Sequence, residues 1–212
     1  MKNNPNALFI TLTFNEENYQ KLAWELFKKD KGNLNYTEQN EMCKTAVRRW
    51  LERIRKKTGK SIKHWIVTEK GEDYGRIHLH GILFTKETKE TIESIWKYGN
   101  IWVGTFVNTK TINYIIKYIT KIDEDHKGFK SIILSSAGIG KQYIERQDAK
   151  NNKYNGENTK ETYILPSGTR TALPIYYRNK IYTVEYRDWE TDRKSTRLNS
   201  SHSAKSRMPS SA

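Results

Sequence analysis

A pair of histidines lies inside the apolar run RIHLHGILF at residues 76–84. A similar run, HWIVTE at residues 64–69, precedes it, and the intervening KGEDYG has the glycines and the aspartate of a turn. The two runs therefore predict an antiparallel hairpin. Side chains alternate along a strand, so His78 and His80 share one face, while Leu79 between them points into the opposite, apolar layer.

Helical and strand-like patterns alternate on both sides of this hairpin. The run ALFITLTF at residues 7–14 is apolar and β-branched, as expected of a buried strand. Helical patterns cover residues 15–32, 37–59, 87–98 and 108–121, and another strand-like run covers residues 101–107. Beyond residue 123 the pattern weakens. The order predicts an α+β fold in which helices cover a central antiparallel sheet that carries the histidine pair.

The chain of 212 residues is strongly basic, with 38 Lys and Arg against 24 Asp and Glu and a formal charge of +14. This surplus favours a polyanionic partner, because lysine and arginine release counterions when they neutralise phosphates. Since no apolar run approaches the ~20 residues that cross a bilayer, we expect a soluble protein with no membrane partner. The single cysteine, Cys43, and the lack of an apolar leader in MKNNPNALF favour a reducing, cytoplasmic setting.

The C-terminal end differs in composition from the rest of the chain. The segment DRKSTRLNSSH at residues 192–202 has no hydrophobic periodicity and resembles the translation of a sequencing adapter. We expect one domain over residues 1–187, cut short at its C-terminal end, and a non-native, disordered tail over residues 188–212; a genuine basic tail is the alternative. Residues 192–212 carry five basic residues and one acidic residue, so +10 remains on residues 1–191.

The histidine pair can hold a divalent metal ion, because two neutral imidazoles on one face of a strand can converge on one point. An H-x-H pair also occurs on strands without a metal, so a third ligand is needed to favour this interpretation. Glu69, at the end of the partner strand, is the expected third ligand, with Glu72 and Asp73 in the turn as alternatives. One carboxylate, two imidazoles and open positions suit Mg²⁺ or Mn²⁺ acting on a phosphate.

The segment YIIKYITK at residues 114–121 repeats the pattern Y-x-x-K. On a helix, Tyr114 and Tyr118 lie one turn apart, as do Lys117 and Lys121. The segment suits an amphipathic helix that buries its isoleucines and keeps its lysines in water. It also suits a pair of nucleophilic phenols with cations close enough to stabilise phenolate and phosphate charge. The segment by itself leaves both interpretations open.

Three segments in order, FITLTF, GRIHLHGILF and YIIKYITK, resemble the motifs of the HUH (His-hydrophobe-His) endonucleases that start rolling-circle DNA replication. The chain is similar in particular to the replication initiators of microviruses, the small single-stranded DNA phages. Weaker similarity at residues 135–145 and 165–182 agrees, which makes residues 1–187 an HUH endonuclease domain. Relaxases of this superfamily place the tyrosine before the histidines, and the simplest transposases have one tyrosine, so the order and number of motifs favour a phage-type initiator.

The resemblance implies a tyrosine helix packed near the metal site and a nicking and joining reaction on single-stranded DNA at a phage replication origin. The two histidines and Glu69 would hold Mg²⁺ or Mn²⁺ beside the scissile phosphate. Tyr118 or Tyr114 would attack in line, giving a 5′-phosphotyrosyl link and a free 3′-OH. With two tyrosines, one can hold the parental end while the other cuts the regenerated origin. Lys117 and Lys121 would stabilise the developing charge.

The resemblance also implies partners in the cytoplasm of a bacterial host, where a host DNA polymerase extends the 3′-OH. The segment GIGKQ at residues 138–142 lacks the Ser or Thr that ends a P-loop and is expected to form a turn, so a host helicase would unwind the duplex. Two alternatives remain, an HUH-type single-strand transposase and a non-catalytic basic nucleic-acid-binding protein. The candidate residues for contacting DNA are Arg48, Arg49, Arg53, Arg76, Arg146, Arg170 and Arg178.

Overall fold

A computed structural model describes residues 4–71, 75–120, 126–150, 162–164, 168 and 170–182. The chain divides into two compact units, the first ending at Ile139 and the second beginning at Gly140. Each unit has a hydrophobic cluster of its own. The predicted tail, residues 188–212, lies outside the described residues, and a single domain over residues 1–187 stays a prediction.

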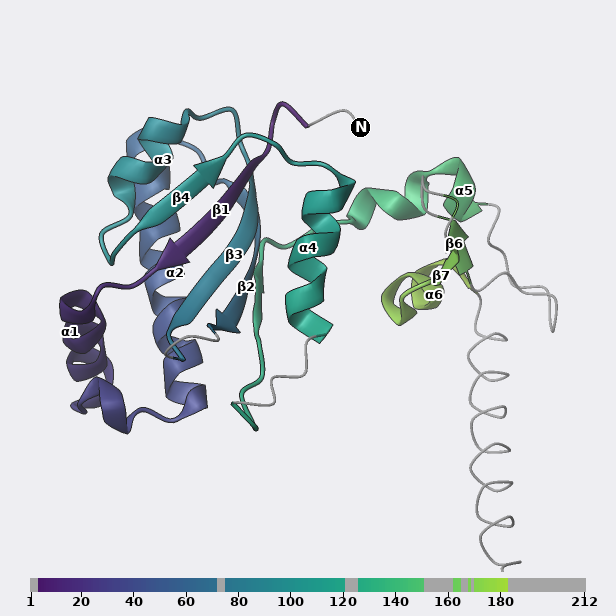
Figure 1. The fold of residues 1–212 in the computed structure, drawn as a ribbon. Coiled ribbons are helices and arrows are strands. Elements are labelled where there is room, and N and C mark those ends of the chain that lie inside the picture. Colours follow the sequence, from purple (N-terminus) through teal and green to yellow (C-terminus); the bar gives the residue numbers. More distant parts are fainter. Residues whose placement is uncertain are drawn as a thin grey trace, which may run out of the picture. The chain divides into compact units, whose positions relative to one another are not determined.

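The first unit contains a five-stranded sheet in which every neighbouring pair is antiparallel (Figure 1). The strands are β1 (Leu8–Thr13), β2 (Lys63–Lys70), β3 (Ile77–Phe84), β4 (Ile101–Gly104) and β5 (Ile133–Ser135), and their spatial order is β4-β1-β3-β2-β5. The sequence predicted the first four strands but not β5, because three residues are too few to carry a periodic pattern. The predicted α+β fold with a central antiparallel sheet is confirmed.

Four helices of this unit accompany the sheet, and local capping chemistry sets their ends. They are α1 (Glu16–Phe27), α2 (Tyr36–Thr58), α3 (Lys89–Ile95) and α4 (Thr109–Thr120), with the short 3₁₀ helix η1 (Lys31–Asn33) between the first two. The Asn15 and Asn35 side chains accept hydrogen bonds from backbone N–H groups in the first turns of α1 and α2. Gly59 ends α2 with a φ of 74°, a conformation that glycine adopts without steric cost.

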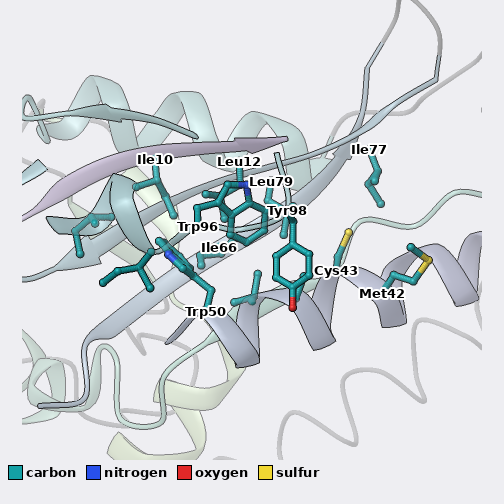
Figure 2. Close-up of a cluster of buried hydrophobic side chains, with 14 of the residues drawn as sticks. Ile10, Leu12, Met42, Cys43, Trp50, Ile66, Ile77, Leu79, Trp96 and Tyr98 are labelled. Carbon is teal, nitrogen blue, oxygen red and sulfur yellow. The ribbon is translucent and has the colours of Figure 1, made fainter. Parts of the chain in front are cut away.

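One face of the sheet packs against α1, α2 and α3 and forms the larger core (Figure 2). Ile10, Leu12, Ile66 and Leu79 point from the strands into this core, where they are fully buried beside Trp50 of α2. Burying such large apolar side chains contributes about 1.5–3 kcal/mol each. Cys43 lies in the same cluster, and burial raises the pKa of its thiol, so it packs as a small apolar residue.

The opposite face of the sheet carries a smaller apolar cluster that holds α4. Phe9, Val67 and Ile82 come from three neighbouring strands, and Ile115 of α4 is fully buried among them. These residues alternate along their strands with those of the larger core, as the period of two requires. His78 and His80 alternate with Leu79 in the same way, so the histidine pair lies on the face that α4 covers.

The second unit is a small cluster of tyrosines built on short elements. They are η2 (Lys141–Glu145), α5 (Gln147–Lys150), β6 (Thr162–Ile164), β7 (Arg170–Ala172) and α6 (Ile175–Ile181). Leu173 and Tyr182 are buried against the rings of Tyr143, Tyr163 and Tyr177. The predicted turn in GIGKQ is confirmed, since it leads into η2 through glycines with φ of 79°. Across the described residues, no helix is both long and apolar enough to cross a membrane.

We expect Gly81→Ala to destabilise the sheet strongly. A Cβ atom at Gly81 would lie 2.7 Å from the Trp65 carbonyl oxygen and 2.9 Å from the Ile66 Cα, so backbone would have to move. Overpacking of this kind costs about 1–3 kcal/mol. Gly32→Ala is the matched control, because nothing lies within 4 Å of its added Cβ. Urea unfolding measures both variants, and equal stabilities would contradict the packing described.

A second prediction concerns pH and His64 of β2, whose Nδ1 lies 2.9 Å from the Ser136 hydroxyl beside β5. Burial lowers the pKa of His64 below its usual 6.5, although the Ile62 carbonyl opposes the shift. The unfolded chain therefore takes up this proton first as pH falls, so the stabilising effect is present above about pH 6.5 and is lost below it. We expect the unfolding free energy to fall less between about pH 7.5 and 5 in His64→Gln than in the wild type. Parallel urea titrations with equal falls would contradict this.

Candidate functional site

The hairpin of β2 and β3 brings three candidate metal ligands onto one face of the sheet. Glu69 pairs directly with His78, and His80 pairs with Val67 on one side and with Thr11 of β1 on the other. Directly paired residues in antiparallel strands point to the same face. The structure therefore places the carboxylate beside both histidines, as the hairpin pattern predicted.

His80 is the most tightly held residue of this group. Its side chain is buried, with 8% of its surface exposed. Nε2 lies 2.9 Å from a carboxylate oxygen of Glu69, and Nδ1 lies 3.1 Å from the hydroxyl of Thr11. A partner at each ring nitrogen fixes both the orientation and the tautomer of an imidazole, as hydrogen-bonding groups around metal ligands do. Sequence reasoning missed Thr11, because its contact depends on which strand lies beside β3.

His78 is half-buried, and its ring stands nearly perpendicular to that of His80, with 6.4 Å between the ring centroids. Gly71 leaves room for it, since a Cβ there would lie 2.9 Å from the His78 Cε1. Burial holds the pKa of His78 below its usual value, and the neighbouring His80 lowers it further. A neutral imidazole results near pH 7, which is the form that binds a metal ion.

The donor chemistry of these residues suits a divalent cation. Two imidazoles and a carboxylate on one partly buried face form the kind of mixed nitrogen and oxygen set that accepts Mn²⁺. In the described part of the chain, however, no three His, Cys, Asp or Glu side chains converge as a complete ligand group. His80 and Glu69 are hydrogen-bonded to each other, and a rotation of side chains is needed for all three to meet at one point.

Helix α4 brings Tyr114 against the histidines. Asn108 caps the helix by accepting hydrogen bonds from the N–H groups of Lys110 and Thr111, and buried Ile115 anchors it to the sheet. The Tyr114 ring centroid lies 6.3 Å from that of His80 and 6.2 Å from that of Phe9. Tyr114 is 48% exposed, so its ring is in contact with the site and also open to solvent.

Several predicted site residues fall in parts of the chain that the structure does not describe. The backbone of α4 includes Lys117 and Tyr118, which confirms that the second tyrosine follows the first by one helical turn. Their side chains lie outside the described part of the chain. Lys121 and the alternative ligands Glu72 and Asp73 lie outside it altogether.

The predicted DNA-contacting arginines are spread over the chain. Arg48, Arg49 and Arg53 belong to α2, on the sheet face opposite the histidines. Arg49 is paired with the Glu25 carboxylate at 2.9 and 2.5 Å, and Arg53 donates to the Tyr98 hydroxyl at 3.3 Å. The structure thus does not bring these three to the site.

The remaining arginines lie elsewhere. Arg76 begins the second half of the hairpin and lies 3.4 Å from a Glu16 carboxylate oxygen. Arg146, Arg170 and Arg178 are in the second unit, where Arg146 and Arg170 are exposed. Contact of any of these arginines with DNA stays a prediction.

Comparison with known protein families matches residues 7–123 to the model of Replication-associated protein ORF2. No curated protein and no solved structure gave a match. The matched region covers more than half of the chain and contains β1, the hairpin with the histidine pair, and the helix with both tyrosines. The chain therefore belongs to the Replication-associated protein ORF2 family and, with it, to the initiators of rolling-circle replication.

Proposed function

We propose that this protein is a metal-dependent endonuclease that nicks and rejoins single-stranded DNA at a replication origin through a 5′-phosphotyrosyl intermediate. The observation that carries the proposal is the position of Tyr114, whose ring contacts His80 while remaining accessible. A phenol beside a histidine and carboxylate group, in a replication initiator family, has the placement that a nucleophile acting on a metal-bound phosphate needs.

His78, His80 and Glu69 are the residues that would hold the ion. A bound Mg²⁺ or Mn²⁺ would polarise the scissile phosphate and neutralise charge on its non-bridging oxygens. Thr11 keeps the His80 ring oriented by its contact at Nδ1, and Gly71 leaves the His78 ring the space to turn. Phe9, stacked against His80 at 6.4 Å between ring centroids, limits water on the inner side of the site.

The tyrosine performs the bond exchange. The phenol loses its proton, its oxygen forms an ester with the phosphorus, the bond from phosphorus to the 3′ oxygen breaks, and that oxygen takes up a proton. The tyrosyl ester conserves the phosphodiester bond, so a later 3′-OH can reverse the reaction and join the ends. Tyr118, one turn after Tyr114 on α4, would provide the second nucleophile, with Lys117 and Lys121 stabilising developing charge.

The biological setting that we propose is a microvirus-like phage in a bacterial cytoplasm. The released 3′-OH is a primer for a host DNA polymerase, and a host helicase would supply unwinding. The motif order and the two tyrosines support this setting over a single-strand transposase.

The metal site predicts a loss of ion binding on mutation. His80→Ala and Glu69→Ala remove donors, so we expect tight Mn²⁺ binding, measured by calorimetry, to disappear along with cleavage of single-stranded oligonucleotides. Thr11→Val keeps every donor but frees the His80 ring, and we expect Mn²⁺ to bind about 10–100-fold more weakly.

His64→Ala is the matched control, because His64 lies on the same strand as Glu69 but on the opposite sheet face. It should bind Mn²⁺ as the wild type does. Unchanged Mn²⁺ binding by His80→Ala would remove the metal site, and a larger effect of Glu72→Ala than of Glu69→Ala would move the third ligand into the turn.

The tyrosines predict a covalent DNA adduct that depends on phenol oxygens. Tyr→Phe removes the nucleophile and keeps the ring, so Tyr114→Phe combined with Tyr118→Phe should abolish the adduct on a denaturing gel while folding is retained. Each single variant should still cleave through the remaining tyrosine but fail at strand transfer, which needs one phenol occupied and the other free.

Tyr36→Phe in α2, on the opposite side of the sheet, is the control and should leave adduct formation unchanged. Strand transfer at the wild-type rate by a single variant would indicate a one-tyrosine, transposase-like reaction. Absence of any adduct from the wild type would leave a non-catalytic binding protein.

A further inference from the structure

An exposed tryptophan lies on the same sheet face as the histidines. Thr11 of β1 pairs with His80 of β3 on one side and with Trp102 of β4 on the other, so the three residues form one row across the sheet. Neighbouring strands are about 4.8 Å apart, which places the Trp102 and His80 backbones about 10 Å apart. Trp102 is 47% exposed, although its neighbours Val103 and Val107 are buried.

The surroundings of Trp102 hold its indole flat against the strand. A Cβ at Gly104 would lie 2.7 Å from the indole Cη2, so the ring occupies the space that a side chain would otherwise fill. Phe9 contacts the ring edge-on, with 5.7 Å between centroids, and Phe106 contacts it at 5.8 Å. A tryptophan fixed on three sides and open to solvent presents a rigid aromatic surface.

The aromatic surface is continuous with the proposed site. Phe9 contacts Trp102 at one end and both His80 and Tyr114 at the other. Among the described strand positions that share this face, Glu69 is the one acidic residue, and Lys63 also lies there, so the face does not repel phosphate. Exposed aromatic rings beside a weakly charged or basic surface are how proteins bind single-stranded nucleic acid, because each base offers a face for stacking.

We infer that Trp102, supported by Gly104 and Phe106, is a stacking platform for a nucleobase of single-stranded DNA next to the scissile phosphate. The inference rests on the proposed function for its ligand and adds the residue that grips the strand beside the cut. Stacking needs an unpaired base, so the platform selects single strands over duplex and tolerates different bases.

Binding without chemistry tests the platform. Fluorescence anisotropy with a fluorescein-labelled oligothymidylate of about 30 nucleotides in EDTA measures affinity while cleavage is prevented. We expect Trp102→Leu, which keeps an apolar side chain but loses the ring, to bind at least about fivefold more weakly than the wild type. On an abasic oligomer of the same length, which offers backbone but no bases, the two proteins should bind equally.

Trp24→Leu is the matched control, because Trp24 is 57% exposed on α1, away from this sheet face, and it should bind as the wild type does. Gly104→Ala tests the same platform without removing the indole, and displacement of the ring should weaken oligothymidylate binding in the same direction. Circular dichroism melting establishes that each variant is folded. Wild-type affinity of Trp102→Leu, or an equal loss on the abasic oligomer, would overturn the platform.

The two proposals fail separately. If the wild type forms a covalent adduct but Trp102→Leu binds oligothymidylate normally, the platform is wrong and the endonuclease stands. If no adduct forms but the affinity difference holds, the platform stands on a protein that binds single strands without cutting them.

Discussion

The pleat of β3, the middle strand of the sheet, is the constraint on which the site depends. With β1 on one side and β2 on the other, each residue of β3 must point either toward the helices α1–α3 or toward α4. Leu79 is fully buried on the first side, and this fixes His78 and His80 on the second. A shift of one residue in this pairing would move an aliphatic side chain into the site and two imidazoles into the core.

The division of the sheet into two faces also divides the tasks of the molecule. Trp50 and its neighbours stabilise the fold on one side, where charged residues such as Arg49 and Glu25 pair with each other at the surface. The other side has a smaller core, anchored by Ile115, and its remaining positions hold polar and aromatic groups around an open surface. A rigid sheet thus carries the histidines, and a single helix presents the tyrosine to them.

Local pattern predicted much of the site, and non-local contact supplied the rest. The hairpin fixes its own register through a short turn, so the position of Glu69 beside the histidines followed from sequence. The contact of Thr11 with His80 and the row that includes Trp102 depend on strand order, which alternation does not reveal. The arginines of α2 formed a basic helix face in the sequence, but that face belongs to the other layer.

The strand order has a consequence for the timing of synthesis. Leu8 pairs with Leu83, and Phe9 pairs with Gly104, so the first strand to leave the ribosome meets its two partners some 75 and 95 residues later. At about 5–20 residues per second, β1 stays unpaired for roughly 5–20 s. During this interval Thr11 has no His80 to orient, and the nascent chain therefore has no assembled site until translation has passed the tyrosine helix.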